Sequence, residues 1–159
     1  MKNLIIIIAL IFGISGSATA AGSSNTDTKS NYDKAVKLIK AAKKYESDGK
    51  TKKAEKRYER ALKLLIKSNS EKPNKADTLN YLGFTSRKLG DFEKGEEFYL
   101  QGLALEPNHN GINEYLGELY VATNRLDLAK ERLKVLESCN CEEYTELKEI
   151  IDGTKQSKY

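Results

Sequence analysis

The stretch Asn80-Tyr81-Leu82-Gly83 returns 34 residues later as Glu114-Tyr115-Leu116-Gly117, and Pro73-Asn74 returns at the same spacing as Pro107-Asn108. Self-similarity at this period is typical of stacked pairs of antiparallel helices, because one pair cannot bury its apolar face alone and shares a core with its neighbours. The sequence therefore predicts an all-α protein built from repeated helical hairpins. Such stacks usually present a binding surface.

The two copies resemble the tetratricopeptide repeat, in which Leu-Gly-x-x-Tyr is followed by Ala-x-x-x-Phe and then by Pro. If Ala76 is position 1, Leu82 and Gly83 fall at positions 7 and 8, and Pro107 falls at position 32. The pattern restarts at Asn110 and repeats the Leu-Gly pair. Small residues at such positions let two helices approach closely, and large ones fill the space between hairpins. The resemblance implies a right-handed superhelical solenoid.

A degenerate first copy lies upstream, with Gly49 in the place that Gly90 holds in the second copy. Its closing Pro73 arrives seven residues late, so either its second helix is longer or residues 68–70 form a loop. We expect three hairpins and a C-terminal capping helix, with Asn140 as its N-cap and a polar, frayed tail after it. The expected helices are 31–47, 51–68, 75–88, 92–104, 109–122, 126–138 and 141–152. The expected units are a signal peptide (1–20), a disordered lead (21–30), a degenerate first repeat (31–75), a second repeat (76–109), a third repeat (110–140), the capping helix (141–152) and a tail (153–159).

Residues 1–20 have the composition of an export signal. Lys2 provides a positive start, residues 4–14 are apolar and uncharged, and Ala18-Thr19-Ala20 has the small-x-small pattern that a signal peptidase cleaves. The apolar run is shorter than the ~20 residues that cross a bilayer. We therefore expect cleavage after Ala20 or Ala21, no stable membrane insertion afterwards, and a periplasmic or secreted bacterial protein. A retained membrane anchor is the alternative.

The resemblance also implies a concave groove that holds an extended peptide or a helix of another protein. In this family, residues on the first helix of each repeat line the groove. Asn80 would bond a peptide backbone, an exposed Phe84 would seat a side chain, and Arg87 and Lys88 would hold a carboxylate. An ordinary solvated face is the alternative. The Lys/Asn/Lys/Arg set with which some members clamp the acidic C-terminus of a chaperone is not reproduced here. The expected groove residues are Asp77, Asn80, Phe84, Arg87, Lys88, Glu114 and Glu118.

Charge is distributed unevenly along the chain. Residues 29–75 contain 16 Lys and Arg against 6 Asp and Glu, whereas residues 76–159 contain 10 against 16. A basic first hairpin attracts anionic surfaces. For an exported protein, anionic lipid, an acidic partner or the chain's own acidic end is a better match than nucleic acid, and the last would give weak head-to-tail association. Solubility alone is the simpler interpretation.

Cys139 and Cys141 are the two cysteines of the chain. An exported pair is expected to form a disulfide where the backbone bends enough to bring the Cα atoms within ~7 Å. The alternatives are a redox-active pair or a soft-metal ligand pair in an accessory protein, and thiols that are free or bonded to another chain. The segment from Cys141 to Lys148 resembles the ending of small exported tetratricopeptide proteins of alphaproteobacteria, with a shortened cysteine spacing.

The sequence shows no arrangement typical of catalysis. His109, the only histidine, lies in the turn after Pro107 and is assigned no role. No nucleophile stands beside a base, and no glycine-rich phosphate loop or set of metal ligands is present. We therefore expect a protein that is not an enzyme and that uses no cofactor and no metal.

Overall fold

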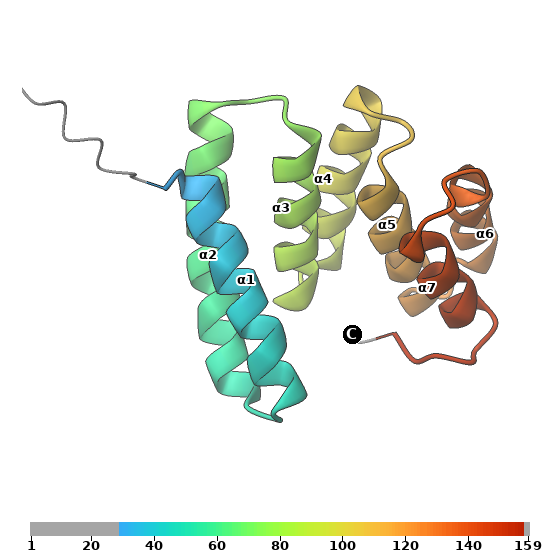
Figure 1. Cartoon of the computed structure of the whole chain (residues 1–159), viewed down its shortest axis with the longest axis horizontal. Coiled ribbons are helices and arrows are strands. Elements are labelled where there is room, and N and C mark those ends of the chain that lie inside the picture. The colour runs from blue at the N-terminus through green and yellow to red at the C-terminus, as the bar shows by residue number, and fades with distance from the viewer. Residues whose placement is uncertain (1–28, 158–159) are drawn as a thin grey trace, which may run out of the picture.

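The computed structural model describes residues 29–157, which fold into a row of antiparallel helices with no strand (Figure 1). The expected signal peptide and most of the expected lead lie outside the described residues. Helices α1 to α6 form three consecutive hairpins, and α7 packs against α5 and α6. The helices are α1 (Asn31–Ser47), α2 (Thr51–Glu71), α3 (Ala76–Lys88), α4 (Phe92–Leu105), α5 (Asn110–Ala122), α6 (Leu126–Leu136) and α7 (Glu142–Ile151). Each agrees with its expected range to within three residues, and the all-α prediction is confirmed.

The same turn closes each of the three hairpins. Gly49, Gly90 and Asn124 occupy its central position with φ of 71°, 88° and 59°, a left-handed conformation that glycine and asparagine tolerate best. In each turn the following amide donates to the carbonyl five residues back: Lys50 to Tyr45 at 2.7 Å, Asp91 to Ser86 at 3.0 Å, and Arg125 to Tyr120 at 2.8 Å. This bond satisfies a carbonyl that the helix end leaves open.

The first hairpin departs from the other two in the length of its second helix. Helix α2 runs without interruption to Glu71, and Ser68 within it is buried. The structure therefore decides between the two alternatives for the late Pro73: the helix is longer, and residues 68–70 form no loop. Figure 1 shows the end of α2 extending past the start of α1 at the top of the first hairpin.

Close approach within the second hairpin depends on Gly83. A Cβ atom built there would lie 2.5 Å from Tyr99 Cε1, on a ring that is fully buried. Gly117 stands in the corresponding place in the third repeat, where a Cβ would lie 2.5 Å from Leu147 Cδ2. The Leu-Gly pair of the sequence motif thus marks where α3 meets α4 and where α5 meets α7.

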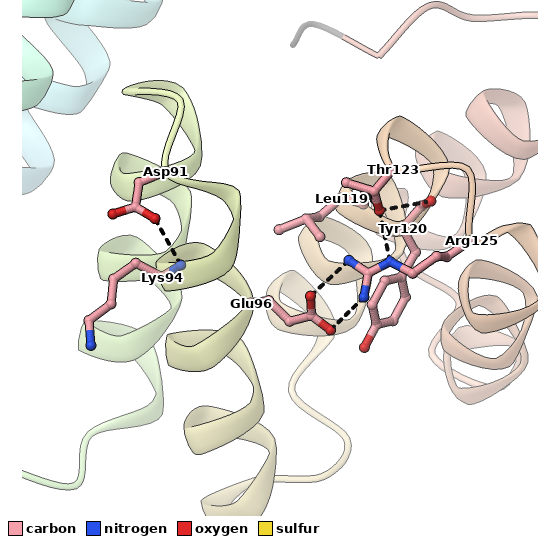
Figure 2. Close-up of polar contacts among 7 residues, drawn as sticks. All are labelled: Asp91, Lys94, Glu96, Leu119, Tyr120, Thr123 and Arg125. Atoms are coloured by element: carbon pink, nitrogen blue, oxygen red, sulfur yellow. Dashed lines mark hydrogen bonds and ion pairs between the residues drawn. The ribbon is translucent and has the colours of Figure 1, made fainter.

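A charged joint connects the second hairpin to the third. Arg125 is the residue before α6, and its guanidinium donates to both carboxylate oxygens of Glu96 on α4, at 2.9 and 2.7 Å (Figure 2). Its Nε donates to Thr123 Oγ1 at 2.9 Å, and the group lies 4.5 Å from the centroid of the Tyr120 ring. A two-pronged contact of this kind fixes the orientation of one hairpin against the next.

Two expectations for the C-terminal region are wrong. Asn140 does not cap α7: its φ is 54°, Cys141 is the N-cap residue, and no side chain caps that end. The tail is not frayed over its described part, because Thr154 and Lys155 both donate their amides to Glu149 O, at 3.0 and 3.1 Å. Gly153, with φ of 73°, reverses the chain so that the tail turns back toward the concave side.

Candidate functional site

A cavity of about 530 Å³ lies where α1, α3, α5 and α7 converge, and the tail borders it. All three hairpins and the capping helix contribute to its wall, so it exists only in the assembled stack. Seven of its lining residues are charged, three are aromatic or aliphatic and three are neutral and polar. The lining residues are Lys43, Glu46, Ser47, Thr51, Phe84, Lys88, Glu114, Tyr115, Glu118, Glu146, Ile150, Lys155 and Gln156.

The floor of the cavity is aromatic. The Phe84 ring packs 5.9 Å from the Tyr58 ring and 5.1 Å from the Tyr115 ring, centroid to centroid. Lys43 of α1 lies over it, with Nζ 4.6 Å from the Phe84 centroid and 3.3 Å from the Tyr115 hydroxyl. Phe84 is only 1% exposed. The expectation of an exposed Phe84 is therefore wrong, because the flanking tyrosines and Lys43 cover most of the ring.

The basic residues expected to hold a ligand's carboxylate are bonded to carboxylates of the chain itself. Arg87 donates from Nη2 to Glu118 at 3.0 Å and from Nη1 to Tyr115 O at 2.6 Å, and its side chain is fully buried. Lys88 lies 2.7 Å from Glu46 on α1. Arg87 thus joins α3 to α5 beneath the cavity, and Lys88 joins α3 to α1 at its rim.

The opposite wall of the cavity is acidic. Glu114 and Glu118 of α5 are nearly buried, and Glu146 of α7 lies beside them. The pKa of Glu114 is raised to about 9, chiefly by burial, with a hydrogen bond to Glu146 and the charges of Glu118 and Glu146 contributing in the same direction. At neutral pH Glu114 is therefore protonated, and this wall carries less negative charge than its three carboxyls suggest.

Asp77 and Asn80 do not reach this cavity. Asp77 accepts from His109 Nε2 at 3.1 Å, while His109 Nδ1 accepts from the Ile112 amide at 3.2 Å. Since Nδ1 accepts, the ring proton is on Nε2. His109 is thus the N-cap of α5, a role that the sequence did not indicate. Asn80 is buried against Gly111, so close that a Cβ there would lie 2.9 Å from Asn80 Nδ2.

Four of the seven expected groove residues line the cavity together, and the sequence missed most of the remaining wall. With Gly49 at position 15, Lys43, Glu46 and Ser47 fall at positions 9, 12 and 13 of the first repeat. Phe84, Arg87 and Lys88 hold the same three positions in the second repeat, so this spacing would have found the equivalent residues in the degenerate copy. Glu146 and Lys155 lie outside the period, and no sequence signal marks them.

Cys139 and Cys141 are joined by a disulfide in the structure, with their Cα atoms 5.2 Å apart. Asn140 between them takes the left-handed conformation that closes this short ring. Both sulfurs are engaged in the bond, so neither is a thiolate that could bind a metal. The bridge lies at the junction of α6 and α7 and not in the cavity wall.

Within residues 29–157, no three His, Cys, Asp or Glu side chains gather in a way that would hold a metal ion. No helix in this part of the chain combines the length and the apolar character that a membrane span needs.

Residues 76–109 match the family model for the tetratricopeptide repeat. These residues are a tetratricopeptide repeat. They span α3, α4 and the turn that follows, and the described chain has the fold of a tetratricopeptide-repeat domain. No curated protein matches the sequence.

Solved tetratricopeptide-repeat structures superpose on most of the chain. The first such domain of Spaghetti (RPAP3), bound to the HSP90 peptide SRMEEVD, is 23% identical, with a TM-score of 0.54 over 79% of this chain and 96% of that one. The second domain of human RPAP3, in complex with an HSP70 peptide, is 19% identical, with a TM-score of 0.51 over 76% and 97%. The Yersinia enterocolitica type III secretion translocator chaperone SycD is 16% identical, with a TM-score of 0.54 over 76% and 83%. At these identities the likeness establishes the fold alone.

Proposed function

We propose that this chain is an exported scaffold protein that binds a peptide or helix of another protein in the cavity between α1, α3, α5 and α7, in the periplasm or outside the cell. The observation that carries the proposal is that all three hairpins and α7 contribute side chains to one concave cavity. Relatives of this fold are bound to peptides in two of the solved structures, which supports the same class of ligand here.

The cavity suits a peptide better than a small metabolite. Its floor offers the half-buried Tyr115 ring, which packs on Phe84, to an apolar side chain, and charges of both signs surround it. Glu46 holds Lys88 at the rim, and Arg87 holds Glu118 from beneath the cavity, so these lining side chains are ordered before a ligand arrives. Preorganised side chains cost little entropy on binding, which favours affinity for an extended chain.

Site-specific photocrosslinking tests the proposal. A photoreactive residue replaces Ser47, which is exposed at the cavity mouth, or Gln101, which is exposed on α4 away from the cavity. In the native cells we expect a discrete adduct from position 47 and none from position 101. Lys43→Glu should weaken the adduct, because it exchanges the cation over the Phe84 ring for an anion. Equal adducts from both positions would overturn the groove assignment.

A weaker contact between copies is also proposed, because the first hairpin is strongly basic and the chain from residue 76 onward is acidic. Head-to-tail association by such a contact should be present at low salt and absent at about 1 M salt, where the Debye length is ~3 Å. Light scattering across a salt series measures it. A molecular mass that stays monomeric throughout would refute it.

A further inference from the structure

The C-terminal tail is held by hydrogen bonds and forms part of the cavity wall. After α7 the chain reverses at Gly153, and the amides of Thr154 and Lys155 and the hydroxyl of Thr154 all donate to Glu149 O. Figure 1 shows this segment running back from α7 toward the lower end of α3. Lys155 and Gln156 then line the cavity opposite residues of α1. The tail therefore occupies part of the concave surface.

Lys155 brings a cation to the acidic wall. Its Nζ lies 2.7 Å from Glu146 Oε1 and 3.8 Å from Glu149 Oε2, and the first of these contacts raises its pKa. The Lys155 side chain remains about one third exposed, so solvent still reaches it while it contacts the wall. Beyond it, Ser157 Oγ is buried without a hydrogen-bond partner among the described residues. Buried hydroxyl groups are normally hydrogen-bonded, so this one indicates that the tail is not packed as a permanent part of the core.

The other charged pairs of the cavity link one helix to another. Arg87 with Glu118 ties α3 to α5, and Lys88 with Glu46 ties α3 to α1. Glu146 is paired with a residue that belongs to no helix. Among these three pairs, it is the one whose cation can leave without separating two helices.

We propose that the tail is an internal ligand of the cavity and that a partner enters by displacing Lys155 with a lysine or arginine of its own. The inference rests on the proposed function and names the partner's chemistry: an extended segment with a basic side chain for the acidic wall and an apolar side chain for the Tyr115 ring on the floor. The occupant seen at the wall is itself a lysine, and the wall's carboxyls suit the same charge from another chain.

Because the tail is part of the same chain, it competes for the cavity and lowers the apparent affinity of a partner's segment. The tail is linked to α7 by a few residues, so its effective concentration at the wall is of millimolar order. If the cavity is open in about a tenth of the molecules, the apparent Kd of a competing segment rises about tenfold. Removal of the Lys155 charge should recover that factor.

The test uses the full-length protein and a labelled peptide with the sequence of residues 153–159, Gly-Thr-Lys-Gln-Ser-Lys-Tyr. Binding is measured by fluorescence anisotropy to wild type, to Lys155→Gln, and to Lys130→Gln, which removes an exposed cation on α6. We expect Lys155→Gln to bind the peptide about tenfold more tightly than the other two. A second peptide, with glutamate in place of the lysine that corresponds to Lys155, should not bind. Equal binding by all three proteins, or by both peptides, would overturn the proposal.

A second measurement needs no variant. Saturating peptide should speed hydrogen exchange at the Thr154 and Lys155 amides of wild type, because a displaced tail loses its bonds to Glu149 O. Unchanged exchange with bound peptide would contradict displacement. The two proposals fail separately: an adduct from position 47 that persists while these tests fail leaves the scaffold function intact and removes only the role of the tail.

Discussion

The buried pair of Arg87 and Glu118 allows a quantitative test of how the cavity is held. The Arg87 side chain is fully buried and that of Glu118 is 6% exposed, and the two lie 3.0 Å apart across the α3–α5 contact. Loss of one partner leaves the other charge in a poorly solvated place, which costs about 3–5 kcal/mol. For a described chain of this size, each kcal/mol lowers Tm by roughly 3–5 °C. Glu118→Leu and Arg87→Met should therefore each lower Tm by about 9–25 °C.

The double variant should behave differently. With both charges gone, two apolar side chains of similar volume fill the same space, and replacement of a buried pair in this way is often neutral or stabilising. We expect the double variant to be more stable than either single variant, with a coupling energy of at least about 2 kcal/mol. Urea unfolding followed by circular dichroism measures all four free energies of unfolding.

The exposed pair Lys94 and Glu97 is the matched control. Their side chains are 45% and 52% exposed, so the same pair of substitutions there should change the free energy of unfolding by less than about 1 kcal/mol. The reasoning is refuted if Arg87→Met and Glu118→Leu cost no more than this control, or if their effects simply add in the double variant.

Three further changes follow from the same packing. Gly83→Ala should lower the free energy of unfolding by about 1–3 kcal/mol in urea titrations, because its methyl group meets the buried Tyr99 ring, and overpacking outweighs the helix propensity gained. Tyr99→Phe should be neutral or stabilising in the same assay, because the Tyr99 hydroxyl is buried with no hydrogen-bond partner among residues 29–157. Glu114 has its pKa raised from 4.5 to about 9, so the folded state binds a proton that the unfolded state releases, and this contribution to stability declines as pH rises from about 4.5 to about 9. Glu114→Gln should flatten that decline in Tm measured across the pH range, and an unchanged slope would contradict the assignment.

Much of the fold could be predicted from the sequence because repeat structure is local. The 34-residue spacing placed α3 and α5 in register, and the matching Gly49 and Gly90 marked the ends of α1 and α3. The length of α2 could not be decided, because both a loop and two extra turns satisfy the late Pro73. The predicted cap at Asn140 was wrong because Asn140 lies inside the ring that the disulfide closes, and the N-cap position falls to Cys141.

The candidate site was harder to predict because it depends on contacts between repeats. Lys88 meets Glu46 across a hairpin boundary, and Arg87 meets Glu118, a residue 31 positions away. When each repeat was considered alone, nothing in the sequence indicated that Arg87 and Lys88 already pair with carboxylates of the chain, so both were predicted to bind a ligand. Phe84 looked exposed for the same reason, since the family positions assume an open face and do not include the lysine that α1 places over the ring. The tail lies outside the repeat, so no sequence pattern predicted that it would contact the cavity.

Hydrogen exchange of the full-length chain, alone and saturated with the partner identified through the position-47 adduct, tests the central claim most directly. Binding in the cavity predicts slower exchange at the end of α1 around Lys43 and Ser47, together with faster exchange at Thr154 and Lys155 as the tail departs. Protection confined to α2, α4 and α6, with the cavity and tail unchanged, would contradict the claim and place the binding surface on the opposite face.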